Sequence, residues 1–281
     1  MEGSALVLGG GGLTGIGWEA GLLAGLAGAG VDLTTADHVI GTSAGSVVGA
    51  QFTSGACTPD ELYERQLVDP AGETFARLGP AVLTRWALAA LRSRDPRRFR
   101  ARLGRMALDA PTPPEAERRA VIAGRLLSHR WPGRPALHVT AVDARTGEFR
   151  AFGAASGVDV VDAVTASCAV PGVWPPATIA GRRWIDGGVR SGANADLARG
   201  CARVVILAPM AGGAGPLVSV RAQAERLAAD GARVAVVTPD AASRAAFGRN
   251  MLDPARRAAA ARAGRAQAAA HARAVAAVWH G

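Results

Sequence analysis

The chain has 281 residues, of which 49% are hydrophobic, and such values are typical of a globular protein with one good core. No apolar run reaches the roughly 20 residues of a membrane-spanning helix. All basic residues behind the net charge of +9 are arginines, alanine and glycine are also in excess, and no basic motif is interleaved with aromatic residues. The charge therefore indicates a compositional bias, and we expect no nucleic-acid partner.

The N-terminus and the cysteines indicate where the protein resides. Met1, Glu2 and Gly3 carry no basic region, and the apolar stretch after them breaks at Gly9, so we expect no signal peptide. The three cysteines form neither an even disulfide framework nor a metal-ligand spacing. We therefore predict a cytoplasmic protein whose arginine-rich surface attracts anionic lipid headgroups, which would place it peripherally on a membrane.

A glycine-rich loop follows the first predicted strand, 5–8, and precedes a predicted helix over 15–28. The consecutive glycines Gly9–Gly12 carry a large ordering entropy and no packing value, which a chain tolerates where a reacting atom must approach the backbone. Free N–H groups in such a loop, next to a helix N-terminus, bind an anion. In acyl transfer that anion is the oxyanion of the tetrahedral intermediate.

The same glycines allow a second interpretation. Gly10, Gly12 and Gly15 satisfy the G-x-G-x-x-G pattern of dinucleotide-binding folds, and Asp32 and Asp37 lie near the position of a ribose-binding acid. In such folds, however, the acid ends the second strand, whereas Asp37 precedes the strand here. A dinucleotide-binding protein stays an alternative that bound NAD on purification would reveal.

The second predicted strand, 37–41, runs into a nucleophile elbow. Residues 41–45 read Gly-Thr-Ser-Ala-Gly, a G-x-S-x-G pattern in which Gly41 and Gly45 permit a sharp turn into the helix predicted over 43–54. The turn would expose the Ser43 hydroxyl as a nucleophile. Taken alone, the pattern also fits a serine that merely caps a helix.

Residues 71–110 interrupt the alternation of strands and helices. They combine an apolar stripe at helical spacing with a following run of arginines. We predict a helical insertion, either packed on the sheet with a solvated arginine tail or acting as a lid that meets lipid.

The remaining pattern predicts an α/β fold. Further strands are expected at 136–142, 148–152, 203–208 and 233–237, and further helices at 59–67, 115–128, 159–168, 217–229 and 254–278. Strands alternating with helices indicate a mostly parallel central sheet with helices on both faces. Residues 1–281 form a single domain in this prediction, and 254–278 form a peripheral C-terminal helix without assigned function.

A candidate base follows the apolar step Trp184-Ile185. Asp186 ends this step and is followed by Gly187 and Gly188, so it lies at the end of an element beside apolar neighbours. An ordinary Asp-Gly turn without any catalytic role gives the same sequence pattern. None of the five histidines is placed on a loop after a late strand, as a serine hydrolase triad would need. Asp186 is therefore the candidate base of a Ser–Asp dyad.

In order and spacing, the glycine loop, the early elbow and the Asp-Gly-Gly step together resemble the patatin-like phospholipases. The resemblance covers about residues 4–210 and extends to the segments 142–148 and 167–176 and to Asn194. One position departs from it, because Thr14 stands where the family's glycine loop usually carries arginine or lysine.

The resemblance implies a three-layer α/β/α fold and a serine acyl hydrolase that cleaves lipid esters without cofactor or metal. It implies that Ser43 attacks the carbonyl and that Asp186 takes the proton. The implied oxyanion donors are the N–H groups of Gly10, Gly11, Gly12 and Ala44, and the implied apolar substrate wall is Trp174 and Trp184. A non-catalytic lipid binder on the same fold stays open, as does the oligomeric state.

Overall fold

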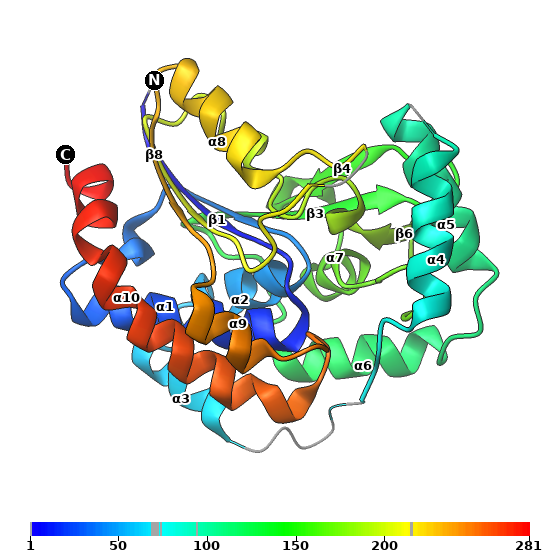
Figure 1. Ribbon diagram of the computed structural model, residues 1–281, viewed down its shortest axis with the longest axis horizontal. Coiled ribbons are helices and arrows are strands. Elements are labelled where there is room, and N and C mark those ends of the chain that lie inside the picture. The colour runs from blue at the N-terminus through cyan, green and yellow to red at the C-terminus, as the bar shows by residue number, and fades with distance from the viewer. Residues whose placement is uncertain (1, 69–72, 74, 94, 214–215) are drawn as a thin grey trace.

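The computed structural model describes residues 2–68, 73, 75–93, 95–213 and 216–281. Its strands are β1 (Ser4–Leu8), β2 (His38–Gly41), β3 (Ala136–Asp143), β4 (Phe149–Phe152), β5 (Ala177–Ile179), β6 (Arg182–Asp186), β7 (Arg203–Leu207) and β8 (Arg233–Val237). In this part of the chain they form one sheet of order β5-β6-β3-β2-β1-β7-β8, with β4 also paired to β3 (Figure 1). The pairs from β3 through β2, β1 and β7 to β8 are parallel, whereas β4, β5 and β6 pair antiparallel. The predicted mostly parallel sheet is confirmed.

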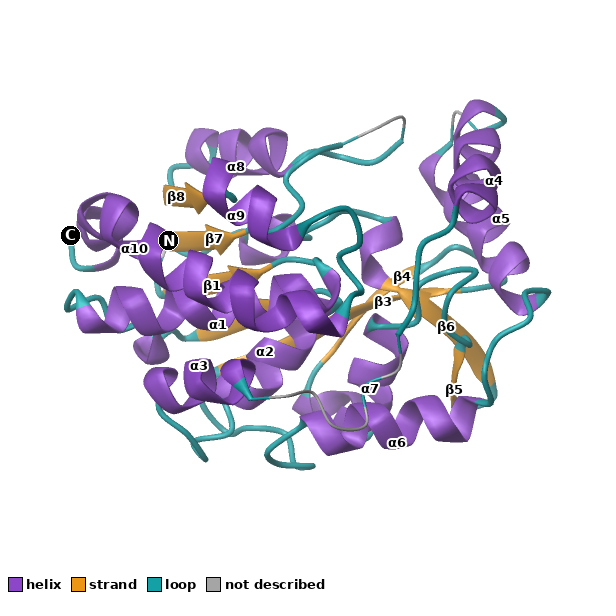
Figure 2. Cartoon of the chain, turned by 60° about the horizontal axis from the view of Figure 1, so that its bottom comes forward, coloured by secondary structure: helices purple, strands orange, loops and turns teal. Residues whose placement is uncertain are grey.

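Helices cover both faces of the sheet. They are α1 (Gly12–Gly28), α2 (Ala44–Phe52), α3 (Pro59–Leu67), α4 (Pro80–Leu91), α5 (Pro96–Leu108), α6 (Glu115–Arg125), α7 (Val160–Ser167), α8 (Val220–Ala229), α9 (Ala241–Phe247) and α10 (Arg257–Trp279). Figure 2 shows α8 on one side of the strands and α1, α2 and α3 on the other. The three-layer α/β/α arrangement is confirmed.

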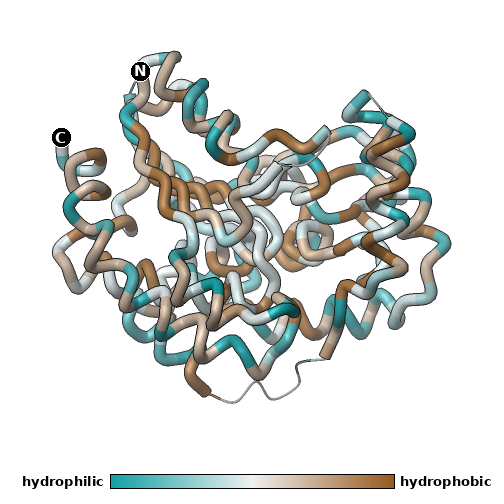
Figure 3. The backbone as a smooth tube through the Cα atoms, in the orientation of Figure 1, coloured by the Kyte–Doolittle hydropathy of each residue, from teal (hydrophilic) through white to brown (hydrophobic). Residues whose placement is uncertain are grey.

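The central strands are apolar on both sides because both faces are covered. Leu6 and Leu8 of β1 belong to a core formed with α1, α2, α7 and α10, whereas Ala5 and Val7 belong to a second core formed with α8. Figure 3 shows the resulting hydrophobic stretch through the central strands. Strands buried on both faces read as continuous apolar runs, which is why β1 and β7 are evident in the sequence.

The predicted insertion over 71–110 divides into two parts with different roles. Helix α5 is a layer of the fold, since Phe99 and Leu103 are buried against Val142 of β3 and Ile185 of β6. Helix α4 packs outside α5 and has no fully buried residue. Both lie at the end of the molecule farthest from the termini (Figure 1). Residues 71, 72, 74 and 94 of this segment lie outside the described residues.

The C-terminal segment is helical as predicted, but it is not peripheral. Helix α10 lies along α1 so closely that the Trp18 carbonyl is in contact with Gly264. The Trp18 indole N–H also donates to Oε1 of Gln267 at 3.0 Å. The small residues of α10, such as Gly264, permit this close approach. None of the described helices is both long and apolar enough to cross a bilayer.

Three elements were absent from the predicted strands and helices, namely β5, β6 and α9. The hairpin β5–β6 turns at Ala180 and Gly181, which have φ of 49° and 74°. A two-residue turn with two positive φ values usually carries Asn-Gly or Asp-Gly, and alanine hides that signal. Helix α9 is only seven residues long, which is too short for a clear helical period.

Candidate active site

The elbow forms where β2 meets α2. Gly41, the last residue of β2, lies beside Leu8, and α2 begins at Ala44. Between them Ser43 has φ 51° and ψ −113°, a left-handed conformation that is strained for a residue with a side chain. A Cβ atom on Gly45 would lie 2.1 Å from the Leu8 carbonyl oxygen, so only glycine allows α2 to start this close to β1. Strain at a serine facing a cavity is typical of an exposed nucleophile.

The backbone of Ser43 is fixed by a residue that the sequence analysis did not single out. The Ser43 N–H donates to Oγ of Ser167 at 2.9 Å, and Ser167 is fully buried at the end of α7. Ser167 lies more than a hundred residues away in sequence, and no local pattern marks such a partner.

Three of the four expected oxyanion donors are free. In the described part of the chain the N–H groups of Gly11, Gly12 and Ala44 have no protein acceptor. The Gly10 N–H instead donates to the Gly192 carbonyl at 2.7 Å. Gly10 thus holds the loop in place beside Ser43, and the free donors lie at the N-termini of α1 and α2, where the helix dipoles favour negative charge.

Asp186 ends β6 and is buried next to Ser43. Burial raises the pKa of its carboxyl to about 7, against the smaller lowering effects of the Ser43 hydroxyl and the Gly188 N–H. That N–H donates to Oδ1 of Asp186 at 2.7 Å, and the Asp186 N–H donates to the Ala169 carbonyl at 3.0 Å. A carboxyl with a pKa near 7 accepts a proton far more readily than an ordinary aspartate does.

A buried amide locks the loop that follows Asp186. The Nδ2 of Asn194 donates to Oγ1 of Thr42 at 3.0 Å and lies 3.2 Å from the Gly187 carbonyl oxygen. Asn194 adopts φ 52°, which asparagine tolerates better than other side chains do. The Thr42 hydroxyl also lies 2.9 Å from that of Thr140 on β3. These bonds tie the elbow to the Asp186 loop, so the side chains of Ser43 and Asp186 keep their relative positions.

The cavity at Ser43 has an apolar wall. Trp174 lines it together with Leu13, Ile16, Val170 and Leu252. Its volume is about 20 Å³, roughly the room that one water needs, so a larger ligand enters only if lining side chains move apart.

The two tryptophans expected at the substrate wall are in different places. Trp174 lines the cavity, but Trp184 is buried in the core, where its ring meets that of Phe152 edge to face with centroids 5.1 Å apart. Trp184 lies two residues before Asp186 in β6, so the two side chains are on the same face of the strand. Asp186 is at the end of the strand, however, whereas Trp184 lies within the sheet. The apolar residues beside Asp186 in sequence therefore do not all line the site.

The site contains neither a histidine nor the acid of a dinucleotide fold. No histidine of the described chain lines the cavity with Ser43. Asp37 accepts from the Ser4 N–H at 2.8 Å, at the edge where β1 and β2 begin, whereas the glycine loop lies where β1 ends. Asp37 therefore cannot reach a ribose held at that loop. Among the described residues, no group of three or more metal-ligating side chains occurs.

The sequence matches the patatin-like phospholipase family over residues 6–199. Among solved structures, the chain is similar to VipD from Legionella pneumophila, with 13% identity and a TM-score of 0.47, over 98% of this chain and 67% of that one. It is also similar to the type III effector protein ExoU, with 15% identity and a TM-score of 0.42, over 98% of this chain and 53% of that one. No curated protein matches. The family match covers well over half of the chain and includes the elbow, the glycine loop and Asp186, so the chain belongs to the patatin-like phospholipase family, a family of lipid ester hydrolases.

Proposed function

We propose that this protein hydrolyses lipid carboxylic esters through a dyad of Ser43 and Asp186. Oγ of Ser43 attacks the ester carbonyl carbon while Asp186 takes the hydroxyl proton. Asp186 then gives that proton to the departing alcohol, which leaves an acyl group on Ser43. In the second half, Asp186 takes a proton from a water whose oxygen attacks the acyl carbonyl carbon. The fatty acid then leaves, and Asp186 returns the proton to Oγ of Ser43, which restores the free enzyme. The observation that carries this proposal is the meeting of a strained serine with a buried carboxyl whose pKa is about 7.

The free N–H groups of Gly11, Gly12 and Ala44 are the proposed oxyanion donors. They belong to two helix N-termini that converge on Ser43, and no side chain is needed to complete them. Gly10 has a supporting role in this proposal, because its N–H is bound to Gly192. Trp174 and its apolar neighbours are proposed to receive the acyl chain once the cavity opens.

Labelling with a fluorophosphonate probe tests whether Ser43 is activated. We expect a single mass addition on the wild-type protein and none on Ser43→Ala, because the probe reacts only with an activated hydroxyl. Ser54→Ala, just beyond α2, is the matched control and should label like the wild type. A folded wild-type protein that takes up no probe would instead favour a non-catalytic lipid binder.

We also propose that α4 meets the lipid surface. Leu83, Leu88 and Leu91 of this helix are 49%, 42% and 82% exposed, and Arg85 and Arg92 flank them. Exposed leucines beside arginines suit an anionic bilayer, because the leucines insert between the lipid headgroups and the arginines bind the headgroup charges.

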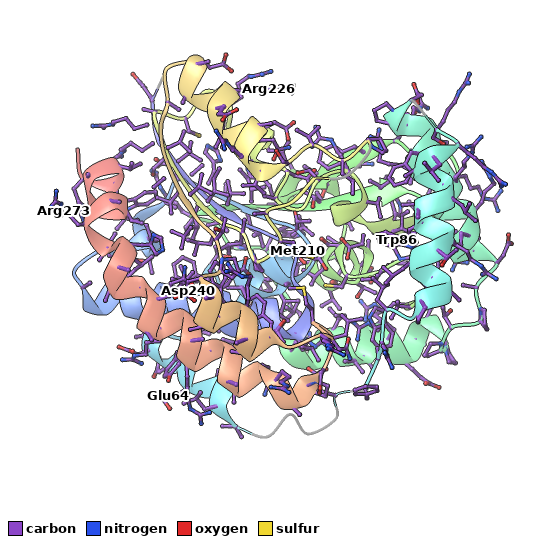
Figure 4. The ribbon with its side chains drawn as sticks, in the orientation of Figure 1. Glu64, Trp86, Met210, Arg226, Asp240 and Arg273 are labelled. Carbon is purple, nitrogen blue, oxygen red and sulfur yellow. The ribbon has the colours of Figure 1, made fainter. Side chains whose placement is uncertain are left out.

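Helix α4 also touches the segment that carries Trp174. The side chain of Trp86 is labelled beside α4 in Figure 4. Its indole N–H donates to the Pro171 carbonyl at 3.3 Å, and Val82 lies against Gly172. Movement of α4 on a lipid surface would therefore free Trp174 to move and widen the cavity, which is the lid role proposed for this part of the insertion.

The double variant Leu88→Glu/Leu91→Glu tests the lipid contact. We expect its cosedimentation with phosphatidylglycerol vesicles to fall about 10-fold or more, because two apolar insertions are lost and two repulsive charges are gained. Activity on a short soluble ester should stay within about twofold. Val236→Glu, an exposed apolar residue of the edge strand β8, is the control and should bind vesicles normally. An equal loss of activity on soluble and vesicle substrates would contradict the lipid contact. It would indicate that α4 only stabilises the segment that carries Pro171 and Trp174.

A further inference from the structure

One wall of the Ser43 cavity is a buried cation. Arg118 of α6 is only 5% exposed, and its guanidinium carbon lies 3.9 Å from the centre of the Trp174 ring. Arg118, Trp174 and Ser43 line the same cavity. A cation stacked on an indole keeps part of its stabilisation without water, which explains how the fold holds the charge in this position.

The charge of Arg118 has no ionic partner among the described residues. Its Nε is buried without any hydrogen-bond acceptor there, and the carboxylate that attracts it, that of Glu73, forms its ion pair with Arg125 instead. The neighbouring Arg125, which lines the same cavity, differs, because its Nε donates to Oε1 of Glu73 at 2.8 Å and its charge is thereby neutralised. One uncompensated positive charge therefore lies at the cavity.

Arg118 stays charged at neutral pH despite its burial. Burial, followed by repulsion from Arg125, lowers the pKa of its guanidinium to about 10. A buried, unpaired charge is costly, and an anion that forms hydrogen bonds with the guanidinium recovers much of that cost. Arg118 thus lacks an anionic partner in the cavity that Ser43 lines. The substrate that enters this cavity is the expected source of such an anion.

We propose that Arg118 forms an anion subsite that selects esters carrying an oxyanion group, a phosphate or a carboxylate, close to the scissile carbonyl. This inference rests on the proposed ester hydrolysis at Ser43. The anion would lie on the free edge of the guanidinium, with Trp174 holding the guanidinium plane from behind. The group can belong to the alcohol part of the substrate, as a phosphodiester does, or to the acyl part, as a second carboxylate does.

Phosphate binding to Ser43→Ala tests the subsite without any turnover. We expect calorimetric titration with inorganic phosphate to show millimolar binding that weakens at least 10-fold in Ser43→Ala/Arg118→Met. The control is Ser43→Ala/Arg119→Met, which removes the same charge one residue along α6, where Arg119 pairs with Asp162 instead of facing the cavity. Binding that is unchanged by Arg118→Met would be an adventitious ion only and would overturn the proposal.

Paired substrates identify the source of the anion. For the acyl part, the pair is 4-nitrophenyl hemisuccinate and 4-nitrophenyl butyrate, which have equal chain lengths. For the alcohol part, it is a lysophosphatidylcholine and the monoacylglycerol of the same chain. In at least one pair, Arg118→Met should lower kcat/KM for the charged member about 10- to 100-fold more than for the neutral one.

The outcomes separate this inference from the proposed function. Equal losses on charged and neutral esters in both pairs would overturn the subsite, whereas absent probe labelling of Ser43 would overturn the hydrolase itself. If Arg118→Met does not fold, Arg118→Lys retains the charge but not the planar fork, and it should lower kcat/KM for the charged ester more than for the neutral one.

Discussion

Asp186→Asn is expected to lower kcat for ester hydrolysis by about 10³- to 10⁴-fold while the chain stays folded. Asparagine has nearly the same shape as aspartate but cannot accept the proton of Ser43. The measurement is the steady-state rate on a soluble ester, with circular dichroism to establish folding. Asp196→Asn, which changes an aspartate paired with Arg190 in the same region, is the control and should keep most of the activity. A fully active Asp186→Asn would contradict the dyad.

The pH dependence of the wild-type enzyme should report the same group. Because burial raises the pKa of Asp186 to about 7, the carboxylate form that we propose as the base is depleted as the pH falls below 7. We expect kcat/KM to fall about tenfold per unit below that pH and to level off above it. A profile that stays flat down to pH 5 would exclude Asp186 as the free enzyme's base.

The free energy of unfolding should show the cost of this arrangement. The folded-state pKa of Asp186 lies above its usual value of 3.8, so the folded chain binds the proton more tightly than the unfolded chain does. As the pH rises from 4 to 7, the free energy of unfolding of the wild type therefore falls, by at most about 4 kcal/mol. Asp186→Asn lacks this loss and should be more stable than the wild type at pH 8, with no such advantage below pH 4.

The candidate dyad could be inferred from the sequence because both of its residues stand at element ends that sequence patterns mark. Ser43 is bracketed by glycines that a tight strand-to-helix turn needs, and Asp186 is followed by two glycines. The buried strands β1 and β7 are equally clear as short apolar runs. These signals are local, so they survive without knowledge of the tertiary fold.

Arg118 and Ser167 could not be found in this way, because their importance arises only from contacts across the fold. In sequence, Arg118 is one of many arginines in a polar helix, and its burial beside Trp174 depends on how α6 packs. Which N–H groups are free to bind an anion also depends on the tertiary fold. Gly10 and Gly11 look alike in the sequence, but only the Gly10 N–H donates to the Gly192 carbonyl.

The packing of α10 against α1 is the other feature that the sequence concealed, and it predicts a large effect on stability. A Cβ atom on Gly21 of α1 would lie 2.0 Å from the Ala261 carbonyl oxygen and 2.8 Å from the Arg265 nitrogen, both of which are backbone atoms of α10. We expect Gly21→Ala to lower the free energy of unfolding by about 3 kcal/mol, because two helix backbones must separate to admit one methyl group.

Gly28, near the end of the same helix, provides the matched control. A Cβ atom there meets nothing within 4 Å, so Gly28→Ala should be neutral or stabilising by up to about 1 kcal/mol from helix propensity alone. Urea unfolding of both variants measures the difference, and equal small effects would show that α10 sits loosely. Because α1 begins at Gly12, in the loop that faces Ser43, we further expect Gly21→Ala to weaken fluorophosphonate labelling, whereas Gly28→Ala leaves it unchanged. That result would tie the C-terminal helix to the geometry of the oxyanion loop.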